Sequence, residues 1–262
     1  MRLTSVLLVA FSAILFSCSP VKIAIINPNW QQQEELSVKG RQGFMLNQKL
    51  SFGAYTTNKV NRSWTKGSSW TWSVPLQNDW VESLNETFVQ KKQTIRFSLK
   101  DAVGNESEVT AFTKVKWTDI SIGKNPNSLV NIIADILTIG DNGSNTFAVR
   151  IMPAKNQAPW EMFIDNDAAQ QKAKTYTGIL AKSKTEYYTV VPIYSLKNKQ
   201  GNAVSMPFGG SVGYEFRDKN GVTLAAVSLI DKGMVYFNNV PPAEKFLLAN
   251  AITALLLQQQ ID

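Results

Sequence analysis

Apolar and polar residues alternate along several short stretches of this chain. The alternation is clearest at residues 70–74, 95–99 and 147–151, where every second side chain is a large apolar one. Because successive side chains of a strand point to opposite faces, this pattern places one face on a core and the other in water. Such strands are typical of antiparallel sheet. We therefore expect a mainly β fold built from antiparallel hairpins.

Turn residues separate the expected strands. Asn220-Gly221 lies between the apolar-rich segments Tyr214–Arg217 and Val222–Leu229. An Asn-Gly pair supplies the positive φ angles of a tight hairpin turn, so this segment predicts two paired strands. Gly104-Asn105 predicts a second turn, after the alternating residues 95–99.

Two segments have a helical pattern instead. Apolar residues recur at three- and four-residue spacing over residues 129–137, with Ser128 as a suitable N-cap and Gly140 as a stop. This predicts an amphipathic helix. Ala243–Leu257 follows Pro241-Pro242, and between Phe246 and Leu257 only Asn250 and Thr253 interrupt a segment that is otherwise apolar on all sides. It is shorter than a membrane span, so we expect a C-terminal helix buried in protein.

The N-terminal residues have the features of an export signal. Arg2 precedes an apolar run from Val6 to Phe16, and the run ends in Leu15-Phe16-Ser17-Cys18. This ending resembles the lipobox of bacterial lipoproteins, although Phe16 stands where a small residue is usual. The resemblance implies that residues 1–17 are removed as a signal peptide, that Cys18 is acylated, and that residues 18–35 form a lipidated tether.

Acylation of Cys18 would leave an exported protein anchored by lipid to the outer membrane or to the cell membrane. Ser19, in place of an acidic residue after the cysteine, favours the outer membrane in an organism with two membranes. Two alternatives stay open, namely ordinary secretion and an N-terminal helix packed within the protein. The apolar run has 11 residues, whereas a membrane span needs about 20, so the length disfavours an uncleaved transmembrane helix.

The C-terminal part resembles the tubby-like barrels, including plant LURP-type and scramblase-type domains. The resemblance rests on the strand and turn expected at Tyr214–Gly221, on the strand-like segment Val222–Phe237 that follows, and on the apolar helix after it. It implies a closed antiparallel barrel wrapped around a buried C-terminal helix. The alternative is an α+β domain in which the helix packs between a sheet and a second layer.

The domain organisation has two interpretations. Residues 36–262 form one domain, or residues 36–140 and 141–262 form two β-rich units that each end in a helix. Duplication is suggested because Phe97–Gly104 and Tyr214–Gly221 share the order apolar-x-apolar-basic-Asp, at nearly the same offset as the two helices.

The composition of the chain excludes several kinds of catalytic site and any internal disulfide. The chain has no histidine, and Cys18 is its one cysteine. Ser-His-Asp catalysis, thiol catalysis by a lipidated chain and internal disulfides are therefore excluded. The net charge of +7 favours anionic surfaces, but the cations are scattered and match no nucleic-acid-binding module. We expect no enzyme, cofactor, metal or nucleic-acid partner.

Three short motifs are explained by turns. Gly209–Gly213 matches the G-x-S-x-G pattern of hydrolases, but strand-like residues follow it and no histidine is present. Asp165-Asn166-Asp167 and residues 141–145 carry oxygen ligands without the distal Glu of a calcium loop. We assign no catalytic residue and no metal ligand to them.

The best candidate binding surface is a group of tryptophans with neighbouring cations: Trp64, Trp70, Trp72, Arg62 and Lys66. On an exposed sheet face these rings would stack on sugars or lie in a lipid interface, and the cations would favour anionic groups. The alternative is that the tryptophans fill the core.

These observations predict a lipid-anchored cell-envelope protein with a non-enzymatic binding role. Its ligand would be a hydrophobic molecule, an envelope polymer or a protein partner, and the membrane itself is reached through the N-terminal lipid. A carboxylate-based glycan hydrolase and a structural subunit of an envelope assembly are the alternatives.

Overall fold

The computed structural model describes residues 21–42, 47–63, 93–115, 145–153, 157–206 and 210–258. Within them the helices are α3 (Asn166–Gln171) and α4 (Pro242–Leu257). The strands are β1 (Glu34–Ser37), β2 (Ser51–Phe52), β3 (Tyr55–Thr57), β4 (Asn61–Ser63), β5 (Gln93–Lys100), β6 (Glu106–Val115), β7 (Thr146–Met152), β8 (Trp160–Asp165), β9 (Gly178–Ala181), β10 (Tyr187–Ile193), β11 (Ser195–Lys197), β12 (Ala203–Ser205), β13 (Gly213–Arg217), β14 (Thr223–Ser228) and β15 (Met234–Phe237). The amphipathic helix expected at residues 128–140 and the alternating residues 70–74 lie outside this part of the chain.

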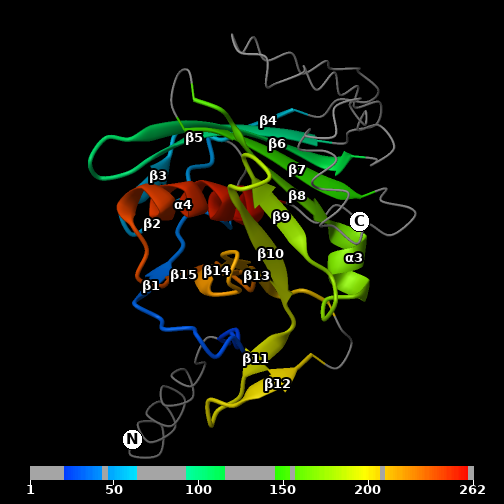
Figure 1. The fold of residues 1–262 in the computed structure, drawn as a ribbon. Coiled ribbons are helices and arrows are strands. Elements are labelled where there is room, and N and C mark those ends of the chain that lie inside the picture. Colours follow the sequence, from blue (N-terminus) through cyan, green and yellow to red (C-terminus); the bar gives the residue numbers. More distant parts are fainter. Residues whose placement is uncertain are drawn as a thin grey trace, which may run out of the picture.

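Twelve of the described strands form one nearly closed antiparallel barrel (Figure 1). Their order is β1-β15-β14-β13-β10-β9-β8-β7-β6-β5-β3-β2, and β4 pairs with β5 beside this path. The first strand pairs with the last, so that Leu36 lies opposite Val235. At the other end Lys39 and Ser51 exchange backbone hydrogen bonds of 2.9 and 3.0 Å, which brings the chain after β1 against β2. The expectation of a mainly β, antiparallel fold is confirmed.

The C-terminal helix α4 lies inside this barrel, where the curved sheet surrounds it in Figure 1. Each residue from Phe246 to Leu257 is buried, and Leu248, Ile252 and Leu255 are 0% exposed. The buried C-terminal helix is therefore confirmed, and it begins one residue earlier than expected. A helix that is apolar on all sides needs an apolar surround, and the inward side chains of the strands provide it.

The alternating residues of β5 and β7 face α4, as their pattern predicts. We expected the outward face of β7 and β8 to contact water. This expectation is wrong for Ala148 and Phe163, which are each 1% exposed there. Arg150 and Glu161 are also buried on this face and form an ion pair, with 2.9 Å between Arg150 Nε and Glu161 Oε1. Burial of both charges is tolerable because each supplies the other with a charged hydrogen-bond partner.

Three of the described hairpins share one turn geometry. Each starts with Asp or Asn, whose side-chain Oδ1 accepts the backbone N–H groups two and four residues later, at 2.8–3.0 Å. The fourth residue is Gly104, Gly201 or Gly221, with φ between 75° and 91°. The hairpin predicted at Asn220-Gly221 is present, but its turn is wider than a two-residue one, since of these two residues only Gly221 has a positive φ.

A two-stranded arm projects from the barrel after β10. We call residues 195–205 the arm; β11 and β12 pair within it, with Leu196 opposite Val204. The N-terminal segment runs along the other edge of β11, where Ile23 pairs with Leu196. Figure 1 shows the arm and this blue segment together below the barrel. Neither described helix has the length and apolar character that a membrane span requires.

Candidate functional site: a hollow at the base of the arm

Helix α3 begins where the sequence suggested a turn. Asp165 is its N-cap, and the carboxylate Oδ1 accepts the N–H of Ala168 at 3.0 Å. The Tyr176 hydroxyl accepts the N–H of Asp165 at 2.5 Å, so the start of the helix is fixed from both sides. The oxygen-rich Asp165-Asn166-Asp167 thus serves to begin a helix, as the buried N-cap shows.

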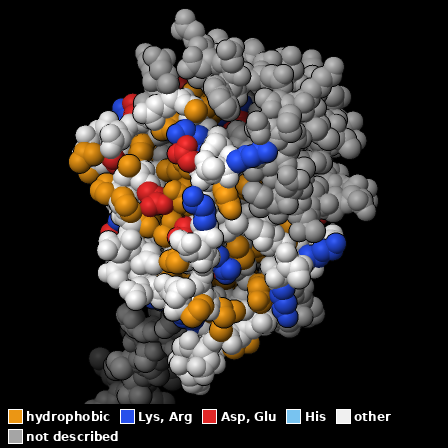
Figure 2. All heavy atoms as spheres, in the orientation of Figure 1, with side chains coloured by type: hydrophobic (Ala, Val, Ile, Leu, Met, Phe, Trp, Pro, Cys, Tyr) orange, Lys and Arg blue, Asp and Glu red, His pale blue; other side chains and the backbone are white. Residues whose placement is uncertain are grey.

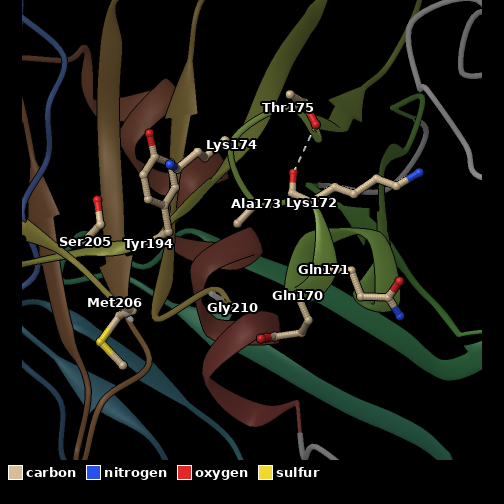
Figure 3. A pocket seen from close by; sticks show the side chains of 10 residues that line it. All are labelled: Gln170, Gln171, Lys172, Ala173, Lys174, Thr175, Tyr194, Ser205, Met206 and Gly210. Carbon is tan, nitrogen blue, oxygen red and sulfur yellow. Dashed lines mark hydrogen bonds between the residues drawn. The ribbon is translucent and has the colours of Figure 1, made fainter. Parts of the chain in front are cut away.

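A hollow of about 370 Å³ lies between the end of α3 and the base of the arm (Figure 3). Its lining includes side chains from the α3 turn on one wall and from the two ends of the arm on the other. The lining residues are Gln170, Gln171, Lys172, Ala173, Lys174, Thr175, Tyr194, Ser205, Met206 and Gly210. Tyr194 directly precedes β11, and Ser205 ends β12, so the hollow lies at the base of the arm.

Two lysines of this lining point in different directions. The ammonium of Lys174 lies 5.8 Å from the centre of the Tyr194 ring, within the range of a cation–π contact. In Figure 3 the side chain of Lys172 extends away from the hollow, on the other side of the α3 turn. The hollow therefore has one cation, placed over an aromatic ring.

Gln170 connects the loop before β13 to the α3 side of the hollow through a hydrogen bond. Its Oε1 accepts the N–H of Ser211 at 3.1 Å. A Cβ atom at Gly210 would lie 2.5 Å from that Oε1, and the φ of Gly210 is +88°, so the loop requires glycine at this position. The Ser211 hydroxyl donates to the carbonyl oxygen of Gly213 at 2.6 Å and β13 follows directly, an arrangement unlike the strand-turn-helix of a hydrolase nucleophile.

The lining determines what chemistry the hollow offers. Its described residues include no Asp or Glu, so they contain no pair of carboxylates for glycoside hydrolysis. They do provide an aromatic ring, side-chain amides, hydroxyls and one ammonium group. This combination suits a polar ligand with a ring face to stack and an anionic substituent to meet the cation.

Of the residues proposed from the sequence, Arg62 is the one that the structure describes. Its Nη2 donates to the carbonyl oxygen of Leu257 and to Gln48 Oε1, both at 3.0 Å. Burial lowers the pKa of the Arg62 guanidinium from its ordinary value. Cys18, Trp64, Lys66, Trp70 and Trp72 lie outside the described residues, so lipidation and the tryptophan surface stay predictions.

A second arginine makes similar contacts at the same end of α4. Arg41 Nε donates to the carbonyl oxygen of Leu256 at 3.1 Å, and its Nη1 donates to Leu229 and Asp231 carbonyl oxygens at 2.7 and 2.8 Å. Burial is the main cause that lowers the pKa of Arg41, opposed by the nearby charge of Asp231. These two arginines belong to the fold of the barrel, because they satisfy carbonyl groups at a helix end that has no further helical partner.

Charged side chains of both signs are present on the face of the molecule that Figure 2 presents, where lysines and arginines are interspersed with acidic residues.

Sequence reasoning did not single out the residues of this hollow. A helix as short as α3 is too brief to show a helical period, and Tyr194 and Met206 become neighbours only when the arm folds back. Asp165, followed by Ala168 and Ala169, was the available signal, since Asp is a favoured N-cap. Comparison with known proteins adds no assignment, because no family model, curated protein or solved structure matches this chain.

Proposed function

We propose that this chain is a lipid-anchored protein of the cell envelope that binds, without catalysis, an envelope polymer carrying anionic groups. The observation that carries the proposal is the Lys174–Tyr194 pair in the hollow, where a ring and an ammonium group lie together in a lining that also contains hydroxyl and amide groups. Aromatic rings pack on sugar faces, and an ammonium group favours an acidic substituent on the same unit.

The interior of the barrel is filled, which favours a ligand-binding site on the outer surface. Helix α4 occupies the space that a hydrophobic ligand would need, and its residues from Phe246 to Leu257 are buried among the strands. An apolar molecule would have to displace this helix from the core. We therefore assign ligand binding to the outer surface of the barrel, and an extended polymer suits an open hollow there.

The barrel also supports an architectural parallel with the tubby-like barrels. The shared features are a nearly closed antiparallel sheet and a C-terminal helix within it. We propose this parallel for the arrangement of the elements alone, and it assigns no binding residue in this chain.

The lipid anchor is tested by the fate of Cys18. The full chain is expressed in a bacterial host, its envelope is fractionated, and the mass of the N-terminal peptide is measured. We expect envelope association and an N-terminal acylated cysteine at position 18, and we expect Cys18→Ser to lose both. A wild-type protein that is released without acyl mass would contradict the anchor.

The binding role is tested with dextran sulfate as an anionic polymer and dextran of the same length as a neutral one. We expect the protein to prefer dextran sulfate, and Lys174→Ala to weaken that binding about ten-fold, as the loss of one charged contact predicts. Lys172→Ala is the matched control, because this neighbouring lysine extends away from the hollow. Equal losses in the two variants would mean that net charge, and not the hollow, holds the polymer. Release of reducing ends from a glycan would contradict the non-enzymatic role.

A further inference from the structure

The arm extends on the same side of the barrel as the start of the described chain at Val21. Its outer end, the tip, consists of residues 198–202 between β11 and β12. The N-terminal segment pairs with β11 in antiparallel fashion through Ile23 and Leu196. Since β11 runs outward toward the tip, its antiparallel neighbour has its own N-terminal end, Val21, on the same side as the tip.

Backbone hydrogen bonds fix this arrangement. Ala24 N–H donates to Ser195 C=O and Lys197 N–H donates to Lys22 C=O, both at 2.8 Å. Ile23 is buried at 2% exposure in a small apolar cluster on the outside of the barrel, which also includes Ile193 and Tyr236. The segment from Lys22 onward is thus part of the folded domain and does not act as a free tether.

Covalent geometry limits how far this segment can lie from an anchor at Cys18. Lys22 is four residue steps from Cys18, and a fully extended chain covers at most about 14 Å over that interval. With the acyl chains of Cys18 in the bilayer, Lys22 lies within that distance of the lipid headgroups. Its partner Lys197 is on the neighbouring strand, about 5 Å further along the sheet at most.

The residues at this end carry three lysines and one nearby carboxylate, that of Glu35. Residues 21–33 and 194–206 contain Lys22, Lys197 and Lys199 and no Asp or Glu. Lys22 forms an ion pair of 2.8 Å with Glu35, and the pKa of Glu35 is lowered by the hydrogen bond from Lys22 and, to a smaller extent, by the charge of Lys197. Lys197 and Lys199 are exposed, so the three lysines outnumber this carboxylate. Val21 and Val204, each 51% exposed, add apolar surface beside these cations.

From this arrangement we infer that the tip of the arm is a foot that rests on anionic phospholipid headgroups of the membrane in which Cys18 is anchored. The inference rests on the proposed lipid anchor. Lysines close to an anionic membrane surface are attracted to it, and this attraction falls off within about a Debye length. The short tether is therefore essential to the contact. The foot would hold the barrel in one orientation, with the hollow at the base of the arm close to the membrane.

The test uses single-cysteine labels on the mature, acylated protein. Cys18 is the one native cysteine, and acylation occupies its sulfur, so an introduced thiol is the sole reactive one. Gln200→Cys places a fluorophore on the tip, and Val103→Cys places one on the β5–β6 turn. The two positions are matched, because each is the third residue of the same kind of turn, with its N–H donating to the first residue's Oδ1 at 3.0 Å. In Figure 1 the β5–β6 hairpin and the arm lie on opposite sides of the barrel.

Each labelled protein is reconstituted in vesicles of phosphatidylglycerol and phosphatidylcholine that contain a lipid with a quencher on its headgroup. We expect at least about three-fold stronger quenching at position 200 than at 103 for a foot held within a Debye length of the headgroups. Lys197→Glu with Lys199→Glu, or vesicles of phosphatidylcholine alone, should remove most of that difference. Lys219→Glu is the control, since Lys219 is the second residue of an equivalent turn, as Lys199 is.

The outcomes separate the inference from the proposed anchor. A protein that floats with the vesicles but is quenched equally at positions 200 and 103 overturns the foot and leaves the anchor intact. A protein that carries no acyl group and does not float overturns both. A difference in quenching that survives the Lys197→Glu and Lys199→Glu changes and pure phosphatidylcholine also overturns the role of anionic headgroups.

Discussion

The guanidinium of Arg62 donates a hydrogen bond to the carbonyl oxygen of Leu257, the last residue of helix α4, across 3.0 Å. Arg41 makes the equivalent contact with Leu256 at 3.1 Å. The end of a buried helix presents carbonyl groups that water cannot reach, and a charged donor satisfies them while complementing the negative end of the helix dipole. The two arginines therefore join the N-terminal strands of the chain to its C-terminal helix.

Replacing Arg62 with methionine should destabilise the barrel. Arg62→Met keeps most of the apolar stem but leaves the Leu257 carbonyl and Gln48 Oε1 without this donor. We expect the free energy of unfolding to fall by about 2–3 kcal/mol, measured by urea denaturation. The exposed Lys59 nearby in sequence gives the control Lys59→Met, which should change it by less than about 0.5 kcal/mol. Equal effects of the two substitutions would show that the hydrogen bonds of Arg62 contribute little to stability.

A second stability prediction concerns the close approach of β13 and β14. A Cβ atom at Gly213 would lie 2.1 Å from the backbone oxygen of Val227. Gly213→Ala should therefore push the two strands apart and cost about 3 kcal/mol or more. Gly104→Ala, at a position with no atom within 4 Å of the added Cβ, should cost only the ~1 kcal/mol of a positive φ. Thermal unfolding of the two variants compares these costs, and a similar loss in both would refute the steric explanation.

Local pattern was enough to predict the parts of this fold that depend on neighbouring residues. The alternation at residues 95–99 and 147–151 predicted strands that face the core, and the all-apolar segment up to Leu257 predicted a buried helix. Closure of the barrel depends on a pairing between Leu36 and Val235, about two hundred positions apart in sequence. No periodicity reports such a contact, because each strand end offers the same backbone groups to any partner.

The roles of individual polar residues were harder to infer for the same reason. Arg62 drew attention through its tryptophan neighbours in sequence, whereas its described hydrogen bonds are made with Gln48, Gln93 and the end of α4. The hollow combines α3 with both ends of the arm, and the chain between them carries no motif. Sequence patterns report which face is buried, while a site depends on which segments meet.

High pH should destabilise the protein through its buried tyrosines. Burial raises the pKa of Tyr55, Tyr214 and Tyr236 to about 12, above the ~10 of an exposed tyrosine. A raised folded-state pKa favours the neutral phenol, so this stability is fully present below pH ~10 and is lost as the pH rises toward 12. Urea denaturation at several pH values, with absorbance at the phenolate band, measures the slope. Tyr214→Phe should reduce that slope, and an unchanged slope would contradict the contribution of Tyr214.

Ligand binding by the hollow should depend on the fit between Gly210 and Gln170. An added methyl group at Gly210 collides with Gln170 Oε1, whose hydrogen bond to the Ser211 N–H fixes the wall of the hollow. We expect Gly210→Ala to weaken dextran sulfate binding about ten-fold, while the loss of one hydrogen bond lowers the unfolding free energy by only about 1–2 kcal/mol. Gly221→Ala is the matched control, since its φ is +75° and nothing lies within 4 Å of the added Cβ. Both changes impose backbone strain, but only the first reaches the hollow. Binding that falls equally in the two variants would assign the effect to strain alone, and the hollow would then no longer be the site that holds the polymer.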